Sequence, residues 1–211
     1  ALGIKNVLCL DGDHPAKGDH PEAKRVYDID AIQWIAAVRQ IRDQGSLMNG
    51  KSISGDPGFF IGTAANPFVK SLELHVIRLK KKIAVGAEFI QTQPVFDLER
   101  FNEWLRFCKE QGLTDQCPIM ASVVVLKSAA MAEHLQKNVP GVMIPETVID
   151  ELRSVSEEQQ LEQGIRICVE KIQALMETKG VRGVHVMAMG CEERLPEIIE
   201  QAGLLPRPNL S

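Results

Sequence analysis

The chain has 211 residues, of which 45% are hydrophobic and 25% are charged, and its formal net charge at pH 7 is −4. This composition is ordinary for a globular protein, so it excludes disorder, collagen and coiled coil as descriptions of the whole chain. The acidic balance argues against a nucleic-acid binder, and no apolar run reaches the roughly 18 residues that a membrane-spanning helix needs.

Strands and helices are expected to alternate along the chain. The pattern predicts a strand at 6–10, a helix from Asp28 or Asp30 to Gly45, a strand at 59–64 and a helix between Ser71 and Gly86. It continues with a strand at 88–92, a helix over 97–111, a strand at 118–125, a short helix from 128 and a small helix after 145. A longer helix over 157–178, a strand at 184–189 and a helix over 192–202 complete the series.

Five strand-then-helix units in a row predict a parallel sheet that helices cover on both faces. Two architectures fit this series, an open doubly wound sheet and part of a (β/α)₈ TIM barrel, and periodicity alone does not choose between them. In both architectures the loops that follow the carboxyl ends of the strands build the functional site.

Polar residues follow the first and second predicted strands. Asp11-Gly12-Asp13 comes directly after the first strand, where two carboxylates suit proton transfer or charge tuning, and an ordinary polar turn is the alternative. The motif Gly12-Asp13-His14-Pro15 recurs as Gly18-Asp19-His20-Pro21. After the second strand, small residues at 63–65 leave room for a flat ligand and Asn66 offers both a donor and an acceptor, and an ordinary loop closed by Asn66-Pro67 is the alternative.

The third strand ends with two amides, Gln91 and Gln93, which point to the same side of the sheet. A buried glutamine needs a hydrogen-bond partner, so we favour a role in recognising a heterocyclic ligand. A basic run on the second helix has two interpretations: a solvated helix face, or one or two cations that reach a diphosphate. It consists of Arg78, Lys80, Lys81 and Lys82.

Metal and disulfide chemistry are not expected. None of the five cysteines forms a C-x-x-C pair, and no histidines have the H-E-x-x-H spacing, so we expect no metal site and a reducing cytoplasm as the compartment. The motifs G-x-S-x-G and G-x-G-x-x-G and the Walker loop are absent, which removes the common hydrolase, Rossmann and kinase interpretations.

The chain resembles the methylenetetrahydrofolate reductase family, over the part of the flavin-binding barrel from the fourth strand to the end. The matching stretches are NVLCLDGDHP at 6–15, VYDIDAIQWI at 26–35, FFIGTAANPF at 59–68, LKKKIAVGAEFIQTQPVFDLERF at 79–101, LKSAAMAEHLQKNVPGVMIP at 126–145 and GVRGVHVMAM at 180–189. They span nearly the whole chain in order. The loop at 12–30 is similar to that of anaerobic, one-carbon-pathway members of the family.

The resemblance implies a single α/β barrel domain over 1–211, made of strands four to eight of a (β/α)₈ barrel. The first three βα units of the family, with the glutamate that protonates folate, have no counterpart here, and we expect 1–211 not to be an independent enzyme. The implied activity is FAD-dependent reduction of 5,10-methylenetetrahydrofolate to 5-methyltetrahydrofolate. NADH, NADPH and an iron–sulfur partner subunit remain open as electron donors, and a homo-oligomer is expected.

The resemblance also assigns residues to the flavin. Asp13 matches a catalytic aspartate close to the flavin and the pterin, where its charge disfavours the reduced, anionic flavin and helps hydride to leave. The other matches to flavin contacts are Leu10, Asp11, Gly12, Tyr27, Asp28, Ala65, Asn66, Arg78, Lys81 and Lys82. Among these, Lys82 matches the lysine that meets the diphosphate, and Asp11 stands where many members have arginine. Ala65 and Asn66 fall where other members place a tyrosine near the ring.

On the substrate side, Gln93 matches the glutamine that hydrogen-bonds the pterin. Met131 and Leu135 stand where other members carry a glutamine and an aromatic residue, and Met187 stands where others have tyrosine. Two other hypotheses remain: a catalytically inactive barrel or accessory subunit of a folate or methyl-transfer complex, and a different parallel α/β protein such as a corrinoid or pterin methyl carrier.

Overall fold

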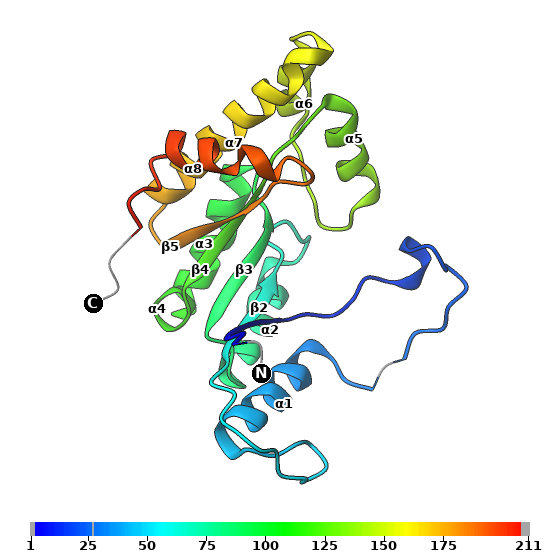
Figure 1. Ribbon diagram of the computed structural model, residues 1–211, viewed down its shortest axis with the longest axis vertical. Coiled ribbons are helices and arrows are strands. Elements are labelled where there is room, and N and C mark those ends of the chain that lie inside the picture. Colours follow the sequence, from blue (N-terminus) through cyan, green and yellow to red (C-terminus); the bar gives the residue numbers. More distant parts are fainter. Residues whose placement is uncertain (1–2, 27, 208–211) are drawn as a thin grey trace.

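The computed structural model describes residues 3–26 and 28–207 of the chain. Within them, five parallel strands form one sheet, in the same order as along the chain (Figure 1). The strands are β1 (Asn6–Cys9), β2 (Phe60–Ala65), β3 (Phe89–Pro94), β4 (Ile119–Val124) and β5 (Val181–Met187). All five were expected from the sequence, although β5 begins and ends earlier than predicted.

Helices connect the strands as expected. They are α1 (Ala31–Gln44), α2 (Leu72–Ala84), α3 (Leu98–Glu110), α4 (Leu113–Gln116), α5 (Ala129–Asn138), α6 (Glu146–Arg153), α7 (Gln160–Glu177) and α8 (Leu195–Gln201). Short 3₁₀ turns precede α7 and α8, at Glu157–Gln159 and Glu192–Arg194. The four-residue helix α4 was not expected, because the segment after Gly112 is too short to show an apolar stripe.

Local sequence explains where α1 begins and ends. Asp30 is its N-cap: the carboxylate accepts the backbone N–H of Gln33 at 2.9 Å, and the Gln33 side chain accepts the N–H of Asp30 at 2.9 Å. This reciprocal capping box selects Asp30 over Asp28 as the cap. At the other end Gly45 adopts a φ of +60°, the left-handed conformation that commonly ends a helix.

The strand order decides between the two architectures. A doubly wound sheet reverses its strand order at one point, and this reversal puts helices on both faces. The described strands run from β1 to β5 without a reversal, and right-handed connections then place the helices on a single face. The doubly wound alternative and the expected cover on both faces are therefore wrong. The singly wound order is that of a TIM-like barrel.

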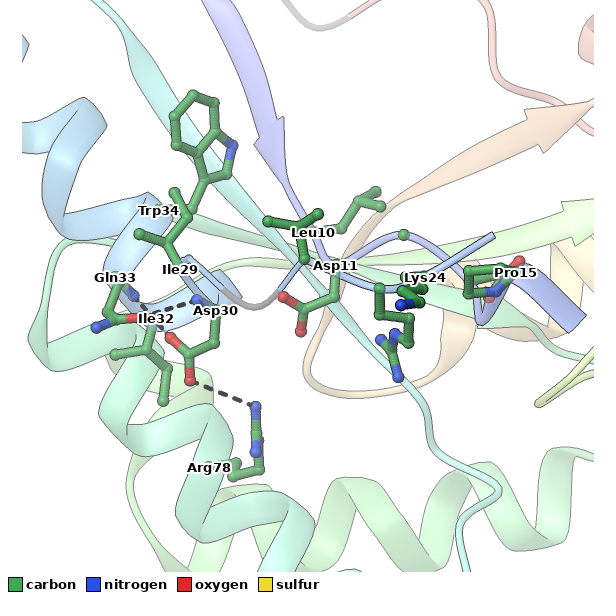
Figure 2. A pocket seen from close by; sticks show the side chains of 14 residues that line it. Leu10, Asp11, Pro15, Lys24, Ile29, Asp30, Ile32, Gln33, Trp34 and Arg78 are labelled. Carbon is green, nitrogen blue, oxygen red and sulfur yellow. Dashed lines mark hydrogen bonds and ion pairs between the residues drawn. The ribbon is translucent and has the colours of Figure 1, made fainter. Parts of the chain in front are cut away.

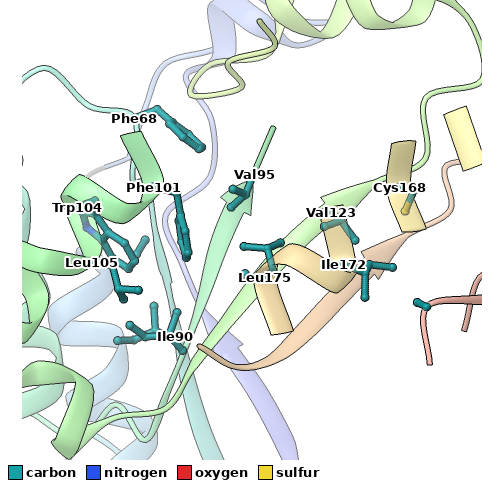
Figure 3. Close-up of a cluster of buried hydrophobic side chains, with 14 of the residues drawn as sticks. Phe68, Ile90, Val95, Phe101, Trp104, Leu105, Val123, Cys168, Ile172 and Leu175 are labelled. Carbon is teal, nitrogen blue, oxygen red and sulfur yellow. The ribbon is translucent and has the colours of Figure 1, made fainter. Parts of the chain in front are cut away.

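The core lies between the sheet and this helical layer. Ile90 and Val123 from the strands pack with Phe101 and Trp104 of α3 and Ile172 of α7, and these five side chains are nearly inaccessible to solvent (Figure 3). Register places Ile90 beside Ile119 of β4 and Val123 beside Val186 of β5 on the same face. The apolar runs of the strands thus supply one continuous buried surface.

The opposite face of the sheet carries a different set of residues. Gly62 of β2 pairs with Phe89 of β3, whose ring stacks on Phe60 with centroids 5.4 Å apart. Phe60 is nevertheless 43% exposed, because none of the described helices covers this face. A Cβ atom on Gly62 would overlap the Phe89 ring, so glycine is what allows the ring to lie against the strand.

This contact generates a stability prediction. We expect Gly62→Ala to lower the free energy of unfolding by about 1–3 kcal/mol, because the added methyl group must displace the Phe89 ring from a packed position. Gly183→Ala is the matched control, since Gly183 is also a strand glycine on this face and its Cβ would make only ordinary contact, 3.9 Å from Met120. Chemical denaturation of both variants measures the difference, and equal losses would contradict the explanation.

Candidate functional site

A cleft of about 1130 Å³ lies beyond the carboxyl end of β1. Leu10, Asp11, Gly12 and Asp13, all predicted as site residues, line it together with Arg78 of α2. The remaining lining residues are Pro15, Lys24, Arg25, Val26, Ile29, Asp30, Ile32, Gln33 and Trp34. The structure therefore brings together the loop after β1, the start of α1 and one face of α2.

The cleft combines apolar and charged groups. Leu10, Ile29 and Trp34 lie on one side of the residues drawn in Figure 2, and Arg78 lies on the other. Arg78 forms a 3.9 Å ion pair with Asp30, the N-cap of α1. Both partners are largely exposed, so this pair contributes little to stability and leaves the guanidinium accessible to an anionic ligand.

Lys82 lies one helical turn beyond Arg78 and outside the cleft lining. Its Nζ donates to the carbonyl oxygen of Ala64, at the end of β2, at 2.9 Å. Burial, and then the charge of Arg78, lower the pKa of Lys82, while the carboxylates of Asp11 and Asp30 act in the opposite direction. Lys82 thus supplies a partly buried positive charge behind the cleft. Lys81, its predicted neighbour at the diphosphate, is exposed.

His75 lies on the same face of α2 as Arg78 and Lys82 and was not predicted as a candidate from the sequence. Its Nε2 accepts the backbone N–H of Asn66 at 3.3 Å, and its buried Nδ1 has no partner among the described residues. Burial, and then the charges of Lys82 and Arg78, lower the pKa of His75 to about 4. The imidazole is therefore neutral at pH 7 and carries its proton on Nδ1. The signal in the sequence was the spacing of residues 75, 78 and 82, which share one face of α2.

A second cluster forms at the ends of β2 and β3. Asn66 and Gln93, which were predicted separately, both lie next to Gly141 in the segment after α5. A Cβ atom added to Gly141 would overlap the Asn66 amide and would lie 3.6 Å from Cγ of Gln93. The Asn66 Oδ1 accepts the N–H of Phe68 at 2.9 Å, which forms a tight turn. Gly141 was also missed, because a single glycine in a loop has no distinctive pattern.

Several predicted contacts are not brought to these clusters. Ala65 is 3% exposed and its side chain packs among the helices, so only its backbone is available to a ligand. Leu135 is buried in the cluster formed by α5 and α6 and does not replace an aromatic contact residue. Asp28 is exposed and does not line the cleft. Tyr27 lies outside the residues that the structure describes.

The methionine candidates occupy a third position. Met131 of α5 and Met187 at the end of β5 are half-buried and pack against the same cluster of apolar residues. The Met131 sulfur accepts the N–H of Lys127 at 3.5 Å. They lie at the carboxyl end of the sheet, as expected for residues near a substrate, and they offer apolar rather than hydrogen-bonding contacts.

Residues 3–26 and 28–207 contain neither a helix that could span a membrane nor a cluster of metal ligands. No helix there combines the length and apolar character that a membrane crossing needs. No group of three or more histidine, cysteine, aspartate or glutamate residues in that part of the chain could hold a metal ion.

Comparison with solved structures identifies a neighbour of the fold. An uncharacterized protein from Clostridium thermocellum, described as binding two copies of 5-methyl-5,6,7,8-tetrahydrofolic acid, superimposes with a TM-score of 0.50 at 18% sequence identity. The match covers 71% of this chain and 54% of that chain. At this identity the likeness concerns the fold alone.

Comparison with known sequences gives a more specific result. The chain is 25% identical to a probable methylenetetrahydrofolate reductase (NADPH) of Caenorhabditis elegans, over 97% of this chain and 29% of the relative. It is 27% identical to methylenetetrahydrofolate reductase 2 of Saccharomyces cerevisiae, over 97% of this chain and 33% of the relative. The chain spans about a third of the length of these relatives. A family model described as methylenetetrahydrofolate reductase matches residues 1–203, and the chain therefore belongs to the methylenetetrahydrofolate reductase family.

Proposed function

We propose that the protein carrying this chain reduces 5,10-methylenetetrahydrofolate to 5-methyltetrahydrofolate, with FAD as its cofactor. The observation that carries the proposal is the family match over 1–203, together with Asp13 and Gln93 at the same edge of one sheet. Binding of 5-methyltetrahydrofolate by the structural neighbour from C. thermocellum supports a folate as the ligand of this fold. The alternative is an inactive barrel or accessory subunit, to which Asp11 points because many members have arginine there, and the match to reductases over nearly the whole chain favours the active enzyme.

The cleft fits the cofactor in size and chemistry. FAD has a flat ring and a negatively charged diphosphate, and when bound it would accept hydride and supply it to the folate. The loop from Leu10 to Asp13 leaves its backbone accessible, while Arg78 and Lys24 supply accessible cations for the diphosphate. The partly buried charge of Lys82 adds to the positive potential from behind. In this proposal these residues bind FAD and orient its ring, while the cofactor supplies the redox chemistry.

On the substrate side, Asp13 and Gln93 have separate roles in the proposal. The carboxylate of Asp13 disfavours negative charge on a ring held above the loop, and so favours transfer of hydride away from it. The amide of Gln93 donates and accepts hydrogen bonds at once, which matches the edge of a pterin. We propose NAD(P)H as the electron donor, because the names of two relatives specify NADPH and NADH. An iron–sulfur partner subunit as the donor, and assembly into a homo-oligomer, are also proposals.

We also propose that the described strands are strands four to eight of a closed (β/α)₈ barrel. Each of the edge strands β1 and β5 pairs on one side only within the described residues. Large apolar side chains are exposed near β1 and on the uncovered face, including Leu10 (49%), Trp34 (42%) and Phe60 (43%). Three more βα units would pair with both edges and cover these groups.

The first functional prediction concerns Asp13. Asp13→Asn should keep flavin bound, because the two side chains have the same shape, and should raise the flavin reduction potential by removing a negative charge. Reduction of methylenetetrahydrofolate should slow by about tenfold or more, equivalent to about 1.4 kcal/mol of barrier, with a smaller effect on flavin reduction by the donor. Stopped-flow measurement of the two half-reactions separates these effects.

The local repeat provides the control for this variant. Asp19 lies in the same Gly-Asp-His-Pro sequence as Asp13, is also exposed, and does not line the cleft. Asp19→Asn should leave both half-reactions and the potential unchanged. An Asp13→Asn protein with unchanged folate kinetics and potential would show that the carboxylate has no such role.

A second prediction concerns Gln93. Gln93→Glu should weaken folate binding by about 5- to 150-fold, because a carboxylate cannot donate to the pterin, and lost hydrogen bonds of this kind cost about 1–3 kcal/mol. The donor half-reaction should change little. Gln111→Glu, an exposed substitution at the end of α3, is the control and should leave folate affinity unchanged. If Gln93→Glu released flavin instead, the assignment to the pterin would be wrong.

A third prediction concerns barrel closure. Residues 1–211 expressed alone should aggregate or depend on a partner, bind flavin weakly and not reduce folate, because apolar groups and strand edges are left uncovered. An upstream extension of about 80–100 residues, at about 30 per βα unit, should restore solubility, flavin binding and turnover. A monomeric 1–211 protein that unfolds cooperatively and turns over methylenetetrahydrofolate would refute the closed-barrel proposal.

A further inference from the structure

The segment between α5 and α6 crosses the carboxyl ends of the strands. Met143 forms a parallel bridge with Val95, directly after β3, and its sulfur accepts a hydrogen bond from Arg100 of α3 at 3.2 Å. Two residues earlier in this segment lies Gly141, where an added Cβ atom would overlap the amide of Asn66 and lie 3.6 Å from Cγ of Gln93. The segment is thus fixed at one end and lies between two amide side chains that come from different strands.

Asn66 is held from three directions. Its backbone N–H donates to Nε2 of the neutral His75 at 3.3 Å, and its Oδ1 accepts the N–H of Phe68 at 2.9 Å. Its Nδ2 lies against the α-carbon of Gly141, where a methyl group would overlap it. These contacts fix the amide plane while the described residues offer Nδ2 no hydrogen-bond acceptor, so the two amide protons remain available to a ligand.

Gln93 is held through its backbone. The hydroxyl of Thr92 donates to the carbonyl oxygen of Gln93 at 2.8 Å and accepts the N–H of Ser122 on β4 at 3.1 Å. This bridge lies where the pairing of β3 with β4 shifts register between Gln91 and Pro94. The backbone of Gln93 is therefore tied to the neighbouring strand, and its side-chain stem lies next to Gly141.

From this geometry we infer that Asn66 and Gln93 act as a pair of amides that binds the edge of the pterin, and that Gly141 is the residue that positions them. The inference rests on the proposed function and extends it: it assigns Asn66 to the substrate, as a specificity-determining residue, and not to the flavin ring. Two amides supply several donors and acceptors in a fixed arrangement, which suits a heterocycle that presents donors and acceptors side by side. Glycine suits position 141 because its φ is +83° and because a Cβ atom there would displace the Asn66 amide, which lies beside the Gln93 side chain.

The test measures binding of 5-methyltetrahydrofolate to the flavin-loaded, full-length protein. Gly141→Ala should weaken binding by about tenfold or more, within the range expected for one or two displaced hydrogen bonds. Gly50→Ala is the matched control, since Gly50 has nearly the same φ (+81° against +83°) and its Cβ would meet nothing within 4 Å. This control carries the same backbone strain without the overlap, and its affinity should stay within about twofold of the wild type.

Asn66→Ser tests the amide directly and does not depend on Gly141→Ala folding. Serine keeps an oxygen that can accept the N–H of Phe68, and the backbone contact with His75 is unchanged, so flavin content should be retained. Folate affinity should fall by about 5- to 50-fold. The double variant Gly141→Ala/Asn66→Ser should bind folate about as tightly as whichever single variant has the lower affinity. In the double variant the methyl group added at position 141 no longer has an asparagine amide to displace.

The outcomes separate this inference from the proposed function. If the wild-type protein bound no 5-methyltetrahydrofolate, the proposed function and the inference would both fail. If the wild type bound it and Asn66→Ser did so equally well, or Gly141→Ala behaved like Gly50→Ala, only the inference would be overturned. Loss of flavin from Asn66→Ser at unchanged folate affinity, or fully multiplicative losses in the double variant, would also overturn it.

Discussion

The structure depends on one constraint, the singly wound order of its parallel strands. Because each strand is followed by a right-handed connection to its neighbour, the described helices lie on one face and the carboxyl ends of all five strands meet at one edge. This edge carries Asp13 on the loop after β1, and Asn66 and Gln93 at the ends of β2 and β3. The same constraint leaves the opposite face uncovered by the described helices, with Phe60 and Phe89 stacked on it, and this face is the interior in the proposed closed barrel.

Electrostatics at this edge follow from burial. Lys82 is tied to the end of β2 through its bond to the Ala64 carbonyl. Burial of His75, and then the charges of Lys82 and Arg78, lower the pKa of His75 and keep its imidazole neutral at pH 7. A neutral imidazole can accept the backbone N–H of Asn66, which a protonated ring could not do. One face of α2 therefore both supplies positive charge to the cleft and fixes the loop that carries a candidate substrate contact.

Much of the fold was predictable because its signals are local. The apolar runs of the strands, the Asp30 cap and the Gly45 stop of α1 depend on neighbouring residues, and each was confirmed by the structure. The strand order was not predictable from periodicity, since a doubly wound sheet has the same alternation of elements. The contacts of Gly141 were missed for a related reason, because its neighbours Asn66 and Gln93 come from two other βα units and a single glycine shows no such partner in the sequence. His75 contacts Asn66 within its own βα unit, and this contact was missed because it depends on the path of the loop between β2 and α2.

The central claim is that the protein holds a flavin that passes hydride to methylenetetrahydrofolate. It is tested most directly by reducing the purified full-length protein without oxygen and adding 5,10-methylenetetrahydrofolate while the flavin absorbance is recorded. The account predicts an oxidised-flavin spectrum before reduction, reoxidation of the flavin on adding the folate, and one 5-methyltetrahydrofolate formed for each flavin reoxidised. A protein without flavin, or a reduced flavin that the folate leaves unchanged, would contradict it.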